Sequence, residues 1–209
     1  MMLGARTAAW SGKPLPYDAE VEYLESTGTQ YIDTRFRPGL DFIDYGCYCD
    51  FSIMRLDVNC PLFSCRGANT GNTSFGLWNI ANDRIRFDWK SSVNYNGSVT
   101  VESKHSFKKN NSENNWYIDE SVYSLNTGGY VSIPETMLIF ANRSAGSGSI
   151  SIFSFVRIYN FKYTNPIGTP IFDMIPVRVG SLGFMYDKVS GSFLGNEGTG
   201  AFVIGPDKT

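Results

Sequence analysis

Hydrophobic and polar residues alternate with a period of two along most of this chain. In residues 45–53 and 84–89, every second side chain is apolar, and most of the residues between them are small, polar or charged. Side chains of a β-strand point alternately to opposite faces of the sheet, so this spacing predicts two half-buried strands. Residues 149–161 are apolar at both sets of positions, which predicts a central strand covered on both faces, or one that contains a bulge.

Shorter runs of the same kind recur between clusters of turn-forming residues. Glycine, asparagine, serine and threonine gather at 69–72, 94–97, 126–129 and 144–149, and such clusters separate strands. The shorter predicted strands are 21–24, 30–34, 75–79, 116–118, 137–141, 171–177, 184–187 and 202–205. No stretch keeps an apolar period of 3.6 over three turns, so we expect a nearly all-β chain that forms a sandwich or barrel.

In this chain of 209 residues, the alternating pattern begins only after residue 18. Residues 1–18 contain glycine, alanine, serine and two prolines without any period, and we expect an N-terminal arm there. A disordered leader is the alternative. Residues 19–209 are predicted to form one domain, because all-β sandwiches often reach this size.

Composition and charge narrow the class of protein. Hydrophobic residues make up 42% of the chain, which is ample for a packed core. The net charge of −2 provides no basic field for nucleic acid. No apolar run approaches the roughly 20 residues that cross a bilayer, and the first residues lack the apolar segment of a secretory signal. We therefore expect neither nucleic acid nor a membrane as a partner.

Four cysteines stand at Cys47, Cys49, Cys60 and Cys65. Their spacing is not a common zinc pattern, and the chain has one histidine to assist them. Cys47 and Cys49 lie on one face of a predicted strand, where a free thiol acts as a small hydrophobic group. We favour buried free thiols, with a disulfide as the first alternative and a metal site as the second.

Segments near both ends of the predicted domain carry a family resemblance. Glu22–Thr34 resembles the opening strands of concanavalin A-like, laminin-G-like jelly rolls found in small proteins of phages that infect gut bacteria. Phe172–Gly180, Gly183–Gly191 and Asn196–Gly200 closely resemble the closing segment of the same proteins. The resemblance implies an antiparallel jelly-roll β-sandwich of the concanavalin A-like lectin and glucanase class.

The middle of the chain follows the laminin-G-like order as well. Asn115–Asp119, Met137–Asn142 and Ser154–Asn160 look like three successive strands of those domains, in the same order and spacing. These motifs are weak, because any β-sandwich uses such residues. One departure is Asp119-Glu120, where the family has Asp-Gly, so the turn of that hairpin is expected to differ.

Sugar binding is the chemistry that the residue types favour. Aromatic rings stack on the apolar face of a sugar, and amides bind its hydroxyl groups. Trp78 alternates with Gly76 on the side opposite Phe75 and Leu77, so we expect it to be exposed and to bind a glycan. Trp89, by contrast, is expected in the core. The remaining candidate glycan-binding residues, all of them loop or strand-end asparagines, are Asn69, Asn72 and Asn79.

No catalytic or metal-binding residue is predicted. The chain lacks the Glu-x-Asp-x-x-Glu strand of related glucan-cleaving enzymes, and Glu20 and Glu22 are expected to face solvent. His105 has no nucleophile motif near it. The resemblance allows Ca²⁺, which many laminin-G-like domains bind. The aspartates at 41, 44, 83 and 173 are scattered, however, so no calcium site is assigned.

By resemblance, we expect a non-enzymatic structural protein of a phage virion, either a head or tail decoration or a fibre component. It would display a lectin-like domain to host cell-surface glycans, would bind other virion proteins through residues 1–18, and could form a homo-oligomer. The alternative is a secreted or surface-attached bacterial carbohydrate-binding module of the laminin-G-like type. A glycoside hydrolase is the third class, and it would need two carboxylates facing each other across a cleft.

Overall fold

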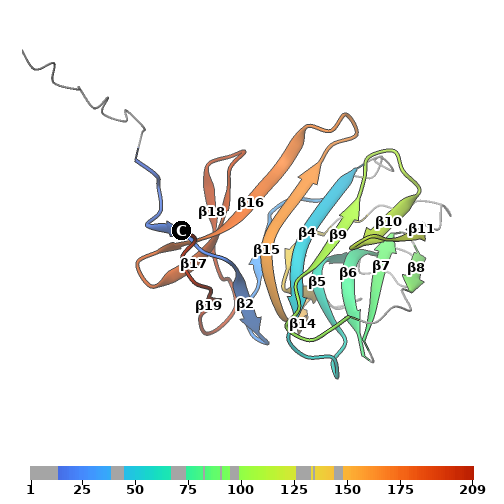
Figure 1. Ribbon diagram of the computed structural model, residues 1–209, viewed down its shortest axis with the longest axis horizontal. Helices are drawn as coiled ribbons and strands as arrows, with labels where there is room; N and C mark the ends of the chain where they lie inside the picture. The colour runs from blue at the N-terminus through green and yellow to red at the C-terminus, as the bar shows by residue number, and fades with distance from the viewer. Residues whose placement is uncertain are drawn as a thin grey trace, which may run out of the picture.

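The computed structural model describes residues 14–38, 45–66, 74–81, 83–89, 91–94, 99–125, 133, 135–143 and 148–209. Within these ranges the chain forms nineteen strands and no helix. The strands make two sheets stacked in layers and a small hairpin (Figure 1). All their pairings are antiparallel. The predicted antiparallel jelly-roll β-sandwich is therefore confirmed.

The larger sheet has eleven strands. Its strands are β1 (Ala19–Glu20), β2 (Leu24–Thr27), β4 (Gly46–Ile53), β9 (His105–Lys109), β10 (Asn115–Ile118), β11 (Ser121–Ser124), β15 (Phe155–Thr164), β16 (Pro170–Val179), β17 (Leu182–Asp187), β18 (Ser192–Leu194) and β19 (Val203–Ile204). The main path runs β11-β10-β9-β4-β15-β16-β17-β18, with β1 on β16 and β2 between β15 and β19. The first and last strands of the chain thus join one sheet.

The smaller sheet has six strands in the order β3-β12-β5-β6-β7-β8. Its strands are β3 (Ile32–Asp33), β5 (Cys60–Arg66), β6 (Ser74–Ile80), β7 (Arg84–Trp89), β8 (Ser91–Asn94) and β12 (Leu138–Ile139). Strands β13 (Ala141–Arg143) and β14 (Ile150–Phe153) form a separate two-stranded hairpin.

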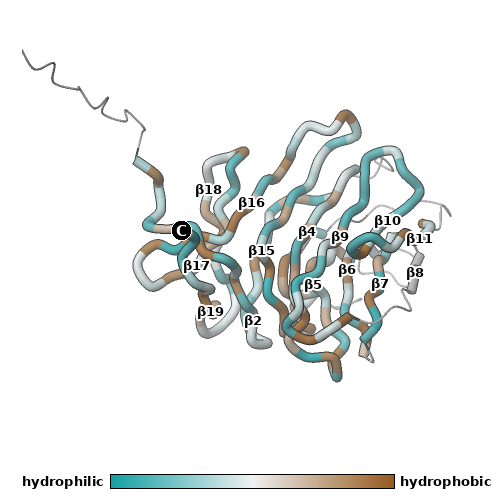
Figure 2. The backbone as a smooth tube through the Cα atoms, viewed as in Figure 1, coloured by the Kyte–Doolittle hydropathy of each residue, from teal (hydrophilic) through white to brown (hydrophobic). Residues whose placement is uncertain are grey.

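The core is an aromatic layer between the two sheets. Phe63 and Phe87 of the smaller sheet meet Phe107 of the larger one, with ring centroids 5.8 Å and 4.9 Å apart. Phe161 and Trp116 extend this layer at 5.1 Å from Phe63 and 5.8 Å from Phe87. Hydrophobic and hydrophilic residues alternate along the strands in Figure 2, which is how each strand supplies one face to this core.

Several predicted strands are confirmed nearly at their predicted bounds. Residues 45–53 form β4, residues 84–89 form β7, and residues 75–79 lie within β6. Clear alternation between a polar and an apolar face was enough to identify them.

The long strand predicted at 149–161 is wrong as a single element. It divides at Ser154 into β14 and β15, because Ser154 turns its backbone N–H to the Phe140 carbonyl and its hydroxyl to that of Pro61. A register shift then follows between Ile158 and Asn160, so the irregularity that the sequence offered as the alternative is present within β15. The shift places Phe161 in the core together with Ile158, whereas regular alternation predicted opposite faces.

Two other predicted strands are displaced. Residues 21–24 fall across the gap between β1 and β2, and residues 137–141 divide into β12 and β13. The second break lies at Phe140, whose φ of 69° is left-handed and ends regular pairing. The strands that were not predicted from the sequence include β5, β8, β9, β11 and β18.

All four cysteines are free and buried, as the favoured interpretation predicted. Residues 1–13 lie outside the described part of the chain, so the N-terminal arm stays a prediction. Tyr17 and Asp18 already contact the sandwich, with Tyr17 5.2 Å from the Tyr186 ring and Asp18 accepting a 2.6 Å hydrogen bond from Gly180 N–H. No helix in the described ranges is long and apolar enough to span a membrane.

Candidate functional site

The two segments that carry the family resemblance interlock at one end of the sandwich. Asn196 Oδ1 accepts hydrogen bonds from Tyr31 N–H at 3.1 Å and from Gly198 N–H at 2.8 Å. Thr29 is bonded from both sides, since its carbonyl accepts from Thr199 N–H at 3.1 Å and its hydroxyl donates to the Thr199 carbonyl at 2.8 Å. The closing turn is therefore fixed against the opening turn by side-chain and backbone hydrogen bonds.

Gly198 is the residue that allows this close approach. A Cβ atom built at Gly198 would overlap the carbonyl oxygen of Thr29 and lie 3.2 Å from Gln30 Cα. Backbone atoms cannot move aside as the end of a flexible side chain can, so the interlock requires glycine here.

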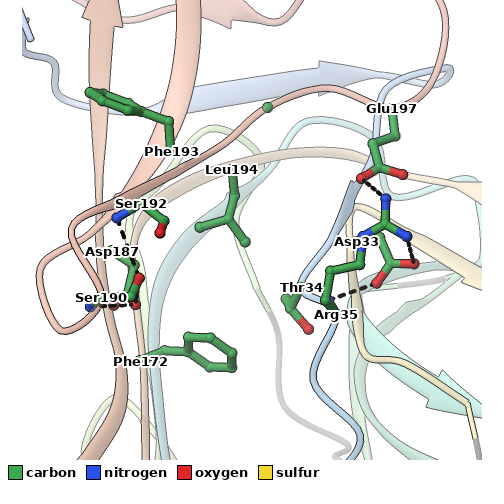
Figure 3. A pocket seen from close by; sticks show the side chains of 11 residues that line it. Asp33, Thr34, Arg35, Phe172, Asp187, Ser190, Ser192, Phe193, Leu194 and Glu197 are labelled. Atoms are coloured by element: carbon green, nitrogen blue, oxygen red, sulfur yellow. Dashed lines mark hydrogen bonds and ion pairs between the residues drawn. The ribbon is translucent and has the colours of Figure 1, made fainter.

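A pocket of about 340 Å³ opens beside the interlock, and we call it the terminal pocket (Figure 3). Strand β3 and the two residues after it supply one wall, and β16, the β17–β18 hairpin and the closing turn supply the other. Its lining residues are Asp33, Thr34, Arg35, Phe172, Asp187, Ser190, Ser192, Phe193, Leu194, Gly195 and Glu197.

Two of the three carboxylates in the pocket, those of Asp187 and Asp33, accept hydrogen bonds from other groups of the protein. Asp187 accepts hydrogen bonds from the N–H groups of Asp173, Val189 and Ser190 and from the Ser190 hydroxyl, the last at 2.6 Å. It is 1% exposed. Its acceptor capacity is thus filled by the hairpin turn that it organises.

Asp33 is committed in the same way. One oxygen accepts from Arg35 N–H at 2.8 Å, and the other accepts from the Thr136 hydroxyl at 3.0 Å and from Arg143 at 3.1 Å. The first bond closes an Asx turn over residues 33–35. That turn holds Arg35 at a left-handed φ of 59°, an uncommon conformation for a residue with a long side chain.

The groups left free for a ligand stand on the rim. The Arg35 guanidinium donates to Glu197 Oε1 at 2.7 Å, and the two side chains are 72% and 36% exposed. Arg35 Nη1 also lies 3.9 Å from Asp33 Oδ2 as an ion pair. The second Glu197 oxygen and the Ser192 hydroxyl have no partner among the described residues. The rim can therefore donate to and accept from a polar ligand at the same time.

The floor between these groups is apolar. Leu194 and the ring of Phe172 point into the space that Figure 3 shows, and Phe36 supports Phe172 edge-on at 5.4 Å. Phe193 alternates with Leu194 along β18, so its ring turns away and packs 5.1 Å from Tyr186. Phe172 is therefore the aromatic side chain that a ligand would meet.

The residues predicted from the sequence do not form this pocket. Trp78 faces away from the core, as its alternation predicted, but the prediction that it is exposed is wrong, since it is 4% exposed. Asn79 is fully buried and donates to the carbonyls of Arg55 and Val58 at 2.9 Å and 2.8 Å, which gives it a structural task. Asn69 and Asn72 lie outside the described residues, so their role stays a prediction. Trp89 is buried in the core, as expected.

The other polar candidates have ordinary partners. His105 Nδ1 lies 2.9 Å from Asp119 Oδ2. Burial raises the pKa of the Asp119 carboxyl, but hydrogen bonds from His105 and Ser106 outweigh it and hold the pKa below its usual value. Asp119 takes a left-handed φ of 52°, a conformation that aspartate adopts more readily than most residues other than glycine. No three His, Cys, Asp or Glu side chains in the described ranges are grouped closely enough to hold a metal ion.

Comparison with known proteins gives a distant structural likeness. No family model matches the chain, and no curated protein matches it by sequence. Among solved structures, the CBM40 module of the Ruminococcus gnavus IT-sialidase bound to α2,3-sialyllactose is similar at a TM-score of 0.45 and 14% identity. The match covers 69% of this chain and 91% of that module. A second structure of the same module matches with the same score, identity and share of this chain, over 90% of the module.

Proposed function

We propose that the protein is a non-catalytic carbohydrate-binding module that takes a neutral sugar unit in the terminal pocket. The observation that carries the proposal is the apolar floor of Phe172 and Leu194 beneath the paired Arg35 and Glu197. A sugar ring presents an apolar face and a polar edge, and this arrangement matches both.

The charge of the pocket favours a neutral sugar. Its lining contains three carboxylates and one guanidinium, so an acidic sugar would meet net repulsion. A neutral hydroxyl can accept from Arg35 and donate to Glu197 at once. The commitment of Asp33 and Asp187 to internal hydrogen bonds supports binding over catalysis, because glycoside hydrolysis needs two carboxyl groups free to exchange protons or attack.

The setting that this function fits is a secreted or cell-surface bacterial module, the alternative that the sequence left open. The virion setting stays a prediction that no described residue favours. Co-purification of the protein with phage particles would test it.

The proposal is tested on a glycan array that carries neutral oligosaccharides and sialyllactose. We expect binding to neutral glycans and weaker binding to the sialylated ones. Arg35→Ala should weaken the best neutral binding about tenfold or more, since a hydrogen bond from a charged group contributes roughly 1.5–3 kcal/mol. Its effect on stability should stay below about 1 kcal/mol, because the Arg35–Glu197 pair is exposed.

Arg55→Ala is the matched control. Arg55 also forms a 2.7 Å ion pair on the surface, with Asp57, but it does not line the terminal pocket. Binding to neutral glycans should survive that change. Equal binding by the wild type and Arg35→Ala would rule out the terminal pocket, and no binding by the wild type would rule out the function.

A further inference from the structure

A second pocket, of about 320 Å³, opens on the outer face of the larger sheet, and we call it the sheet-face pocket. Strand β15, the loop before β9, the segment between β1 and β2 and the last residues of the chain surround it. It shares no lining residue with the terminal pocket. Its lining residues are Glu22, Lys104, Tyr159, Asn160 and Lys208.

A β-bulge in β15 turns two consecutive side chains towards this pocket. The register of β15 on β4 passes from Ile158 directly to Asn160, so Tyr159 has no partner across the ladder. In a regular strand, neighbouring residues point to opposite faces, and Tyr159 and Asn160 could not line the same pocket. Bulges are over-represented beside functional sites because they re-aim a side chain in this way.

Asp50 of β4 holds two polar groups of this wall in position. Its carboxylate lies 3.0 Å from the Lys104 ammonium and accepts a hydrogen bond of 2.9 Å from Asn160 Nδ2. The Lys104 ammonium also lies 4.9 Å from the centre of the Tyr159 ring, whose hydroxyl is hydrogen-bonded to Ser52 at 2.9 Å. Lys104 thus covers a face of that ring, which favours a charged ligand over a stacked sugar.

The facing wall is built from segments near the two ends of the described chain. Glu22 N–H donates to the Pro206 carbonyl, and Lys208 N–H donates to the Glu20 carbonyl, both at 2.8 Å. Side chains alternate along this pairing, so Glu22 and Lys208 lie on the face opposite the buried Val21. The Lys208 ammonium is 3.9 Å from the Glu20 carboxylate. The Glu22 carboxylate has no hydrogen bond or ion pair within the described residues.

Donors outnumber acceptors in the sheet-face pocket. Each ammonium carries three N–H groups, and Lys104 and Lys208 each make one ion pair to a carboxylate of the described chain. Their side chains are 54% and 41% exposed, so a ligand can reach them. Glu22 supplies the one carboxylate among the described lining residues. A ligand carboxylate would match the unused ammonium N–H groups, and a ligand ammonium would match Glu22.

We propose that the sheet-face pocket binds a small zwitterion, a free amino acid, which carries both of these groups. Lys104 binds the carboxylate of the ligand, Glu22 binds its ammonium, and Lys208 supplies further donors at the rim. The volume of about 320 Å³ lies at the lower end of the range for ligand pockets, which suits a ligand of this size. This site goes beyond the sugar-binding function proposed above and does not depend on it, because the two pockets have no lining residue in common.

The first test is a thermal-shift screen of the full chain against the standard free amino acids, followed by calorimetry with the one that binds best. We expect at least one of them to raise Tm by mass action. Its N-acetyl derivative lacks the ammonium, and the corresponding amine lacks the carboxylate. Each should bind about tenfold more weakly, because each loses one charged contact. The absence of any binding among the amino acids would overturn the proposal.

The second test separates the two ends of the ligand. Glu22→Gln should weaken binding of the amino acid about tenfold and leave that of its N-acetyl derivative unchanged. Lys104→Gln should weaken both, because both carry the carboxylate. The matched controls are Glu120→Gln, an exposed glutamate between β10 and β11, and Lys188→Gln, an exposed lysine paired with Asp173 at 3.1 Å.

Both controls should bind the amino acid as the wild type does. Equal weakening of the two ligands by Glu22→Gln, or weakening by a control as large as that by Glu22→Gln, would overturn the assignment. Arg35→Ala distinguishes this proposal from the sugar function, since it should weaken neutral glycan binding and leave amino acid binding unchanged.

Discussion

The terminal pocket and the outer face of the smaller sheet treat their buried polar groups in opposite ways. In the terminal pocket the buried carboxylates of Asp33 and Asp187 accept hydrogen bonds from the protein's own donors, and only exposed rim groups remain for a ligand. On the outer face of the smaller sheet, Trp78 Nε1 and Asn142 Nδ2 are buried and have no hydrogen-bond partner in the described part of the chain. The comparison shows that the hydrogen-bond partners of a buried polar group, and not its burial alone, decide whether it can stabilise the fold.

The largest expected effect is a loss of stability in Asp187→Ala. The change leaves three backbone N–H groups and the Ser190 hydroxyl without their acceptor, and we expect the free energy of unfolding to fall by about 3 kcal/mol. Urea denaturation followed by circular dichroism measures this. The matched control is Asp57→Ala, since Asp57 is an exposed aspartate paired with Arg55, and its loss should change stability little. If Asp187→Ala has the same free energy of unfolding as the wild type, the hydrogen bonds of Asp187 do not stabilise the fold.

Gly198→Ala should have the next largest effect. The added methyl group meets the Thr29 carbonyl, so the closing turn must move away from the opening turn at a cost of about 2 kcal/mol. Glu197 moves with it, so sugar binding in the terminal pocket should weaken. Gly180→Ala is the control for backbone strain alone: nothing lies within 4 Å of its Cβ position, but its φ of 58° is left-handed, so it should lose about 1 kcal/mol of stability and keep sugar binding. If both variants bind and unfold alike, the interlock does not shape the pocket.

The smallest expected effect concerns the four cysteines buried in the core. Burial raises the pKa of all four cysteine thiols, so they should react slowly with Ellman's reagent at pH 8 and all react in denaturant. Because the folded pKa lies above the unfolded value of about 8.5, these thiols leave stability unchanged below that pH and reduce it as pH rises further. A thiol that reacts rapidly in the native protein would show that the core opens, and the two regions would then not be independent.

Much of the fold could be predicted because burial on one face leaves a two-residue period. The two-residue period identified β4, β6 and β7 correctly. It did not identify β5, because a register shift between Pro61 and Phe63 interrupts the alternation. It did not identify β9 either, because Lys109 is fully buried although lysine is usually exposed. Local pattern does not encode these tertiary features.

The site was predicted less well than the fold. Alternation gave the direction of Trp78 correctly but not its burial, since what covers the outer face of a sheet is not a property of the strand itself. Arg35 and Glu197 are 162 residues apart, and no spacing rule joins them. The resemblance did mark both of the segments that interlock in the structure. It could not say which side chains stand at the rim.

The pairing of β2 with both β15 and β19 also sets an order of events during synthesis. A ribosome releases residues 24–27 early, yet one of their two partner strands emerges only with residues 203–204. The opening turn must likewise wait for Asn196–Gly200 before it is fixed. Long-range contacts of this kind close late and slow the folding of β-rich chains, so the sandwich should complete itself only after residues 203–204 have been synthesised.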